Sequence, residues 1–200
     1  MKLIIGITGA SGGIYAASLL QELSKRKFEI HAVASPAGRD VLRFECELGP
    51  EDFPDVVWHK PDNMFSSLAS GSARFDVMVV VPCSMNTLGC IACGISNNLL
   101  QRAAAVMLKE KRRLIVVPRE TPLSTIHLKS MLALDRAGAC ILPASPGFYH
   151  RPQTVEELVN HVTGKILDQF GIPHELFVSW KEPDVHHGGS SGSRERNEAE

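Results

Sequence analysis

Three groups of polar residues stand at the ends of apolar segments in this 200-residue chain. Residues 9–11 (Gly-Ala-Ser) follow an apolar run at 2–8, and residues 84–87 (Ser-Met-Asn-Thr) follow another at 75–81. Arg119-Glu120 follows a third apolar run, between two prolines. Backbone N–H groups and hydroxyls at a helix N-terminus bind phosphate, and a guanidinium binds it through two nitrogens. These groups therefore predict a site for a phosphate-bearing, nucleotide-like ligand.

The glycine-rich turn does not indicate a standard NAD site. The motif Gly6-Ile-Thr-Gly-Ala-Ser-Gly12 lacks the GxGxxG spacing, and Ser35 stands where an acidic residue would hold a ribose hydroxyl. The glycines could serve only to pack a strand against a helix, and Ser84 could be a simple N-cap. Thr8 and Ser11 favour a ligand, because both hydroxyls can donate to an anion. Two such turns in one sheet favour phosphate binding over packing alone.

Two further segments carry groups that could act on a bound substrate. Arg119 suits bidentate phosphate recognition, and Glu120 could be a general acid or base if partly buried beside other charges. An exposed Arg–Glu pair of little energetic value is the alternative. Tyr149 lies in a proline-bounded loop at 143–152 that also holds a histidine and an arginine. His127, within a helical pattern, is interpreted as a structural histidine.

Alternating strand and helix patterns predict the scaffold that positions these residues. They indicate a single α/β domain at residues 1–180, a doubly wound and mostly parallel sheet with the ligand at the carboxyl ends of its strands. Residues 48–74 read as irregular, and the polar segment 181–200 reads as a disordered tail. Strands are predicted at 2–8, 28–34, 77–81, 113–117 and 139–142. Helices are predicted at 11–26, from after the turn at 35–38 to about 46, at 86–111 with a break near 94–97, at 123–137 and at 154–170.

Composition excludes several classes of function. The formal net charge is -1 without a basic block, so no nucleic-acid partner is expected. No apolar run approaches the roughly 18 residues needed to cross a membrane, and the start of the chain does not resemble a signal peptide. Five cysteines, an odd number, indicate reduced thiols and a cytoplasmic location. Cys90 and Cys93 lack a second Cys/His pair and are interpreted as buried structural cysteines, so no metal site is expected.

Seven motifs follow one another along residues 2–180: Gly6-Ile-Thr-Gly-Ala-Ser-Gly12, Pro82-Cys-Ser-Met-Asn-Thr-Leu88, Asn98-Leu-Leu-Gln-Arg-Ala-Ala104, Leu108-Lys-Glu110, Val117-Pro-Arg-Glu120, Ser124-Thr-Ile-His-Leu128 and Pro146-Gly-Phe-Tyr149. In this order they resemble the UbiX/Pad family of flavin prenyltransferases. The resemblance implies a flavodoxin/Rossmann-like fold that binds reduced FMN as a substrate. It further implies that a dimethylallyl group from dimethylallyl phosphate is joined to flavin N5 and C6 without a metal, and that the prenylated FMN product serves a partner UbiD-type decarboxylase. Family members form dodecamers with active sites at subunit junctions.

The same resemblance assigns roles to individual positions. Residues matching the family's flavin contacts are Gly9, Ala10, Ser11, Ser35, Ser84, Met85, Asn86, Thr87 and Arg119. Residues matching its prenyl-phosphate contacts or the charged groups around that phosphate are Tyr149, Lys165, Arg102, Glu45, Lys109 and Glu120. Ser11, Glu45, Lys109 and Glu120 are the implied catalytic residues, with Ser11 near flavin N5 and Glu120 protonating the leaving phosphate. Some relatives carry Arg in place of Lys165 and Trp in place of Met64.

Two other functions of the same fold are weighed against prenyl transfer. An FMN-dependent cysteine decarboxylase would need a catalytic histidine just after the third strand and a Pro-x-Met-Asn clamp. Only His59 lies nearby, and residues 60–65 read Lys-Pro-Asp-Asn-Met-Phe. A non-catalytic FMN carrier subunit would not need the charged residues Glu45, Lys109 and Glu120. Nothing besides the flavin would activate an aromatic acid for direct decarboxylation.

Overall fold

A computed structural model describes residues 1–180, so the tail expected at 181–200 lies outside the described residues. Its core is a six-stranded sheet in the order β3-β2-β1-β4-β5-β6, and every neighbouring pair of strands is parallel. This order is that of the doubly wound Rossmann sheet, which confirms the predicted fold class. The strands are β1 (Lys2–Ile7), β2 (Glu29–Ala34), β3 (Val56–His59), β4 (Val77–Cys83), β5 (Arg113–Pro118) and β6 (Cys140–Ile141).

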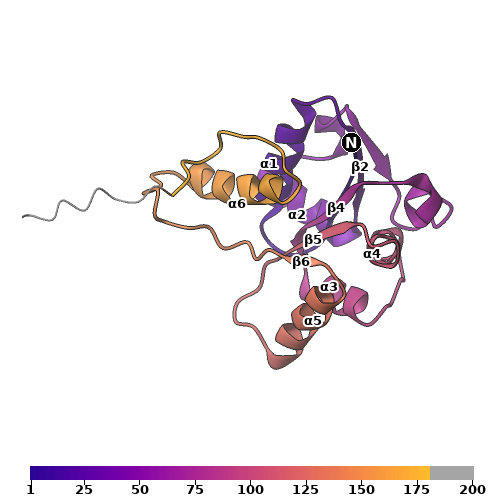
Figure 1. Cartoon of the computed structure of the whole chain (residues 1–200). Coiled ribbons are helices and arrows are strands. Elements are labelled where there is room, and N and C mark those ends of the chain that lie inside the picture. The colour runs from indigo at the N-terminus through magenta and orange to yellow at the C-terminus, as the bar shows by residue number, and fades with distance from the viewer. Residues whose placement is uncertain (181–200) are drawn as a thin grey trace, which may run out of the picture.

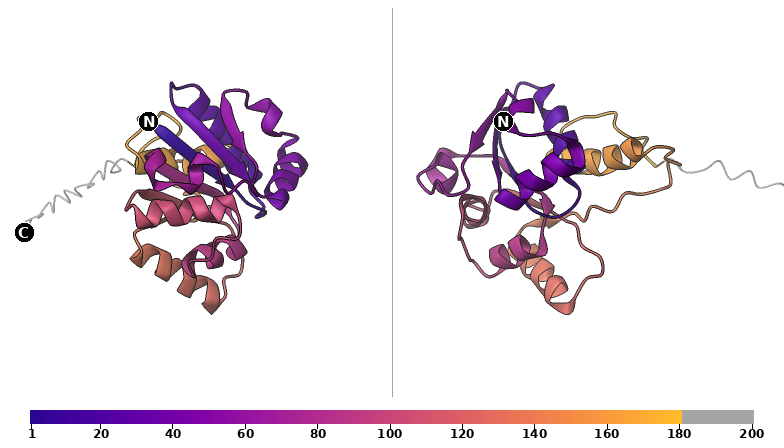
Figure 2. Two further views of the ribbon diagram at one scale, coloured as in Figure 1. Left: turned by 90° about the vertical axis from the view of Figure 1, so that its right-hand side faces the viewer. Right: turned by 180° about the vertical axis from the view of Figure 1, so that it is seen from behind.

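Helices cover both faces of the sheet (Figure 1). One face carries α1 (Gly13–Ser24), α2 (Pro36–Cys46) and α6 (Val155–Gln169), and the other carries α3 (Met85–Ala92), α4 (Leu99–Lys109) and α5 (Thr125–Arg136). Side chains of β1 alternate between the two hydrophobic cores, with Leu3, Ile5 and Ile7 in one and Ile4 in the other. Burial on both faces explains why the strands read as continuous apolar runs. Figure 2 shows the layers from two further directions.

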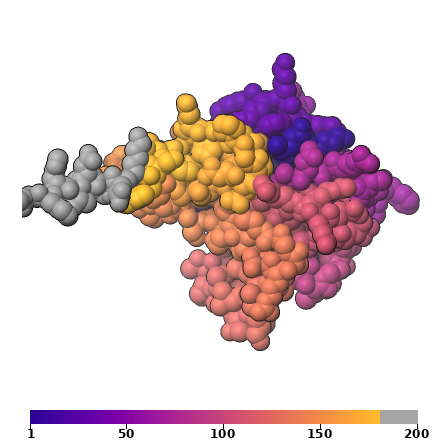
Figure 3. Space-filling view, in the orientation of Figure 1, coloured from indigo at the N-terminus to yellow at the C-terminus, as the bar shows by residue number. Residues whose placement is uncertain are grey.

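The last helix stands to one side of the sheet. After β6 the chain leads away from the sheet to a loop and returns as α6 (Figure 1). A hydrogen bond of 2.9 Å between the Ser18 and Thr163 hydroxyls joins α1 to α6. In the space-filling view the C-terminal segment, in yellow, lies against the N-terminal part of the chain, in indigo (Figure 3). The C-terminal part is therefore attached mainly through α1.

The predicted elements are confirmed to within a few residues, apart from one strand. The segment 48–74, expected to be irregular, contains β3 and three short 3-10 helices at Pro50–Asp52, Ser67–Ala69 and Gly71–Ala73. Four residues are too few to show a period, and β3 pairs only with β2 at the sheet edge. The cysteine interpretation is also wrong for Cys93, which is exposed on the surface side of α3, while Cys90 is only half-buried.

Two searches of residues 1–180 concern membranes and metals. Within these residues no helix combines the length and the apolar character that a membrane crossing requires. The same residues contain no group of three or more His, Cys, Asp or Glu side chains arranged to hold a metal ion.

Candidate active site

The two predicted turns are joined by the hydroxyl of Thr8, at the end of β1. This hydroxyl donates to the carbonyl of Pro82 at 2.7 Å and accepts from the N–H of Ser84 at 2.7 Å. Thr8 is 1% exposed, so the expectation that its hydroxyl contacts a ligand is wrong. Its partners lie more than 70 positions along the chain. Thr8 instead holds the β1–α1 turn beside the β4–α3 turn.

The start of α2 packs directly on the end of β1, where glycines allow the close approach. A Cβ on Gly38 would lie 2.5 Å from the carbonyl oxygen of Ile7, and one on Gly9 would lie 2.6 Å from the Cβ of Ala37. Ser35 caps α2 by accepting the N–H of Gly38 at 3.0 Å, which leaves its hydroxyl hydrogen free to donate. Ser35 and residues 9–11 therefore share one edge of the sheet.

Glu45 reaches from α2 to the N-terminus of α1. Its Oε2 accepts the backbone N–H groups of Gly12 and Gly13, both at 2.8 Å. Burial alone would raise the pKa of the Glu45 carboxyl. Its hydrogen bonds with the Ser11 hydroxyl and these two N–H groups, together with the nearby Arg119 charge, instead hold this pKa below its ordinary value. The protein's own carboxylate thus occupies the first N–H groups of α1, and Ser11 is held in place by it.

Ser84 is the N-cap of α3, as one of the two readings of the sequence expects. Its Oγ accepts the Thr87 N–H at 3.4 Å and donates to the Thr87 hydroxyl at 3.2 Å. Thr87 is buried, Met85 is half-buried and Asn86 is exposed at the same edge. Asn86 is therefore the residue of this group most open to a ligand.

Arg119 ties the end of β5 to both turns. Its Nε donates to the Ser11 carbonyl at 2.9 Å, and its backbone N–H donates to the Cys83 carbonyl at 3.3 Å. Glu120 is exposed, and its carboxylate accepts the Thr121 N–H at 3.1 Å. Both residues line a hollow of about 140 Å³ at the carboxyl ends of β5 and β6. Arg119 and Glu120 thus join the same edge of the sheet as residues 9–11, Ser35, Glu45 and 84–87.

Lys109, at the end of α4, does not reach this edge. It pairs with Glu110 just before β5 begins. Because β5 has six residues, Lys109 lies roughly 20 Å from the carboxyl edge of the sheet. Arg102, nearer the start of α4, donates through Nε to the Ala69 carbonyl at 3.2 Å. One subunit therefore does not bring Lys109 to the flavin-contact residues.

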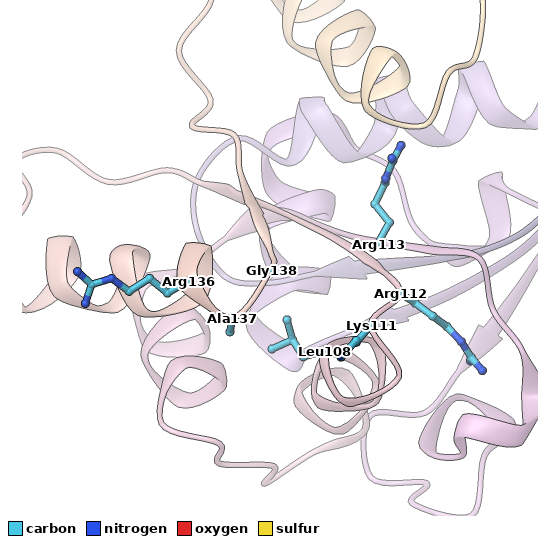
Figure 4. Close-up of a pocket in the computed structure, with 7 residues that line it drawn as sticks. All are labelled: Leu108, Lys111, Arg112, Arg113, Arg136, Ala137 and Gly138. Atoms are coloured by element: carbon cyan, nitrogen blue, oxygen red, sulfur yellow. The ribbon is translucent and has the colours of Figure 1, made fainter.

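A larger pocket at that opposite edge does not form a convergent binding site. It has a volume of about 450 Å³ and lies between the ends of α4 and α5. Figure 4 shows that the guanidinium groups of Arg112, Arg113 and Arg136 point in different directions, away from the pocket. The C-terminal ends of helices also disfavour anions. The pocket is lined by Leu108, Lys111, Arg112, Arg113, Arg136, Ala137 and Gly138.

Tyr149 and Lys165 both belong to the part of the chain around α6: Tyr149 lies in the loop before this helix, and Lys165 lies on it. The Tyr149 ring makes edge contacts with the rings of His161 and Trp180, with centroid separations of 5.6 Å in both cases. Lys165 pairs with Asp168 at 3.1 Å. The segment after β6 leads away from the sheet to this loop (Figure 1). The structure thus separates these two residues from Arg119 and Glu120 within one subunit.

Comparisons with known proteins identify the family. The Flavoprotein family model matches residues 1–167. Flavin prenyltransferase UbiX of Halalkalibacterium halodurans is 47% identical over 195 residues, covering 92% of this chain and 95% of that protein. The chain belongs to the UbiX family of flavin prenyltransferases. Because the alignment spans nearly the whole relative, the family assignment applies to the complete domain described above.

Solved structures of UbiX-family proteins share this fold closely. A dodecameric FMN-dependent Ubix-like decarboxylase from Escherichia coli O157:H7 superimposes with a TM-score of 0.89 at 43% identity, covering 91% of this chain and 100% of that one. AnUbiX (PadA1), in complex with FMN and dimethylallyl pyrophosphate, superimposes with a TM-score of 0.88 at 38% identity, covering 90% and 97%. The fold is therefore that of UbiX-family structures.

His59 does not offer the free imidazole that a cysteine decarboxylase would need. It ends β3, and its Nε2 lies 2.8 Å from Nδ1 of His31 while its Nδ1 lies 2.8 Å from the Ser66 hydroxyl. His31 in turn bonds the Glu29 carboxylate at 3.0 Å. Both ring nitrogens of His59 are therefore engaged inside the UbiX-family fold, away from the turns that carry Ser11 and Ser84.

One residue beside the predicted site, His161, was missed from the sequence. It stands one helical turn before Lys165 on α6 and stacks on His150, the histidine already noted in the loop at 143–152. His161 is 8% exposed, and both ring nitrogens of His150 are buried without a partner in residues 1–180. Spacing on α6 was the available signal, because residues four apart lie on one face of a helix.

Proposed function

We propose that this protein is a flavin prenyltransferase. It joins the dimethylallyl group of dimethylallyl phosphate to N5 and C6 of reduced FMN. The product, prenylated FMN, is then used by a UbiD-type decarboxylase. Membership of the UbiX family supports this function, as does the close similarity to AnUbiX, whose structure contains FMN and dimethylallyl pyrophosphate.

The observation that carries the proposal is the donor set at the carboxyl edge of the sheet. Within residues 1–180, the backbone N–H groups of Gly9, Ala10 and Ser11 have no protein acceptor, whereas the next two N–H groups are bound by Glu45. A side chain at position 9 would collide with Ala37, so only glycine fits there and no side chain covers the backbone N–H groups. Unpaired N–H groups beside a guanidinium are suited to the phosphate of FMN.

Residues at the same edge fit the rest of FMN. The Ser35 hydroxyl can donate, Asn86 offers an exposed amide, and Arg119 uses only Nε for the Ser11 carbonyl among the described residues. FMN, when bound and reduced, supplies the two carbon-accepting positions, N5 and C6. We assign Gly9, Ala10, Ser11, Ser35, Ser84, Met85, Asn86, Thr87 and Arg119 to its binding.

The charged residues have separate tasks in prenyl transfer. Breaking the C–O bond of an allylic phosphate leaves negative charge on the departing phosphate, and the cations Arg102, Lys109 and Lys165 stabilise it. Glu120 is exposed at the carboxyl edge of the sheet, where it can donate a proton to the leaving phosphate. The Ser11 hydroxyl hydrogen-bonds near flavin N5, and Glu45 holds that hydroxyl in place.

The remaining site residues come from neighbouring subunits in this proposal. Because Lys109 lies at the end of α4 and Tyr149 and Lys165 lie on the α6 side, one subunit leaves these three residues away from Glu120. The dodecameric assembly of the similar Escherichia coli protein supports a site completed between copies. We therefore propose that this protein also works as a homo-oligomer of that size.

A cytoplasmic location follows from the same chemistry. All five cysteines are free thiols, which suits a reducing compartment. The substrate reduced FMN also persists best where oxidants are scarce.

Prenyl transfer can be tested by mass spectrometry. Reduced FMN and dimethylallyl phosphate are incubated anaerobically with the protein, and the molecular mass of the released flavin is measured. We expect a flavin heavier by one C5 prenyl unit. An unchanged flavin mass with intact FMN binding would refute the proposal in favour of an FMN carrier. The Glu120→Gln variant should still bind FMN while forming the heavier flavin more slowly.

A further inference from the structure

Side chains from α6 and from the segments before and after it form a compact aromatic cluster, defined here as Tyr149, His150, His161, Phe177 and Trp180. His161 lies at its centre and touches three members. Its ring stacks on His150 at 5.2 Å with planes 5° apart, meets Tyr149 edge-on at 5.6 Å, and packs on Phe177 at 4.8 Å. His161 therefore contacts the tyrosine directly.

A hydrogen bond ties the tyrosine loop to His161. The backbone N–H of Gly147 donates to His161 Nδ1 at 3.2 Å. This nitrogen must carry a lone pair, so the His161 ring is neutral with its hydrogen on Nε2. The approach is close, since a Cβ on Gly147 would lie 3.2 Å from the Tyr149 ring and 3.3 Å from His161 Nε2.

Lys165 is connected to the same histidine through Phe177. It follows His161 by one turn of α6, and its ammonium lies 5.9 Å from the centre of the Phe177 ring, which packs on His161. The segment carrying Phe177 is pressed against the helix, because a Cβ on Gly164 would lie 2.5 Å from that ring. Both groups assigned to the prenyl phosphate thus depend on His161, one directly and one through Phe177.

We propose that His161 is a positioning residue for the prenyl-phosphate end of the substrate, holding the Tyr149 loop against α6 so that the tyrosine and Lys165 act on one phosphate. The inference rests on the proposed function, because that function makes these two residues phosphate ligands. It adds a residue that touches neither FMN nor the phosphate.

The neutral state of His161 is essential to this role. A proton on Nδ1 would remove the acceptor of the Gly147 N–H and would release the loop. Burial, and then the neighbouring His150 and Lys165, lower the pKa of His161, while Asp168 acts in the opposite direction. His174, on the C-terminal segment, bonds Asp168 at 3.2 Å. These groups together keep the ring neutral at physiological pH.

Two variants separate the acceptor from the ring. His161→Phe keeps an aromatic ring without an acceptor, whereas His161→Asn keeps an acceptor near the position of Nδ1 and does not titrate. Loss of the Gly147 bond should raise KM for dimethylallyl phosphate by about fivefold to tenfold in His161→Phe. Affinity for FMN should not change. His161→Asn should restore part of the KM and should lose the acid-side rise in KM that the wild type shows.

Hydrogen–deuterium exchange at the loop gives a readout independent of catalysis. The amide of Gly147 should exchange faster in His161→Phe than in the wild type, and should be protected again in His161→Asn. An unchanged KM or an unchanged exchange rate in His161→Phe would overturn the inference. A wild-type protein that transfers no prenyl group would refute the proposed function instead, and the exchange rates would still decide whether His161 holds the loop.

Discussion

Replacing Thr8 with valine tests whether one buried hydroxyl holds the two halves of the flavin site together. Valine has nearly the shape of threonine, so the core around this position keeps its volume. In the wild type the Thr8 hydroxyl lies 2.7 Å from both the Pro82 carbonyl oxygen and the Ser84 nitrogen. The variant loses the hydrogen bond to Pro82 and leaves the Ser84 N–H without its acceptor. The change is therefore confined to polar contacts.

The expected cost follows from these two contacts. Pro82 keeps a second donor, the backbone N–H of Thr8 at 3.3 Å, so its carbonyl stays paired. The lost bond to Pro82 costs about 1 kcal/mol, and the part-buried Ser84 N–H left unpaired costs about 1–3 kcal/mol. A total of about 2–4 kcal/mol corresponds to a fall in Tm of about 4–16 °C for a chain of this size. Binding of FMN should weaken as well, because Ser84 begins the β4–α3 turn.

Thermal unfolding and FMN titration measure the effect. Both are compared at one protein concentration, since the Tm of an oligomer depends on it. Thr8→Ser is the matched control, because it keeps the hydroxyl and loses only a methyl group worth about 1 kcal/mol. A Thr8→Val protein with a Tm within about 1 °C of the wild type and unchanged FMN affinity would show that Thr8 does not join the turns.

Two further predictions concern packing and acid stability. Gly38→Ala places a Cβ 2.5 Å from the Ile7 carbonyl oxygen and should lower the free energy of unfolding by about 1–3 kcal/mol. The control Gly89→Ala, with no atom within 4 Å of its Cβ, should leave the Tm unchanged or raise it. Equal Tm values for the two variants would contradict the close approach at Gly38. Burial and the neighbouring His31 lower the pKa of His59, so the unfolded chain binds more protons below about pH 6.5 and stability falls with acid. In urea unfolding between pH 5 and 7, His59→Gln should reduce the fall of the unfolding free energy with decreasing pH. An unchanged pH dependence would exclude His59 as a cause.

Local chemistry made most of the fold predictable from the sequence. Long buried strands can be predicted from their apolar runs. The helices begin at side chains that cap them, such as Ser84 and Thr154. The edge strand β3 was missed because four residues carry little periodic signal. Next to Thr154, the Glu157 carboxylate accepts the N–H of Gln153.

Long-range contacts limited what the sequence could say about the site. Thr8 was read as a ligand contact because nothing local shows that its partners are Pro82 and Ser84. The family resemblance predicts Glu45 as a site residue, but its bond to the start of α1 depends on a helix packing across 33 positions. In the proposed function Lys109 reaches the prenyl phosphate of a neighbouring subunit's site. The sequence pattern of one chain does not describe how the subunits are arranged.

The division of the site between the sheet edge and distant helices has a genetic consequence. In the proposed assembly, a defect at Lys109 damages a site that a neighbouring subunit begins, while the edge around Glu120 in the same subunit stays intact. Two alleles, one defective at each position, would then complement each other when expressed together, because mixed oligomers would contain some whole sites. One defective allele beside the wild type would spoil only its share of sites, because each subunit gives its Lys109 to one site.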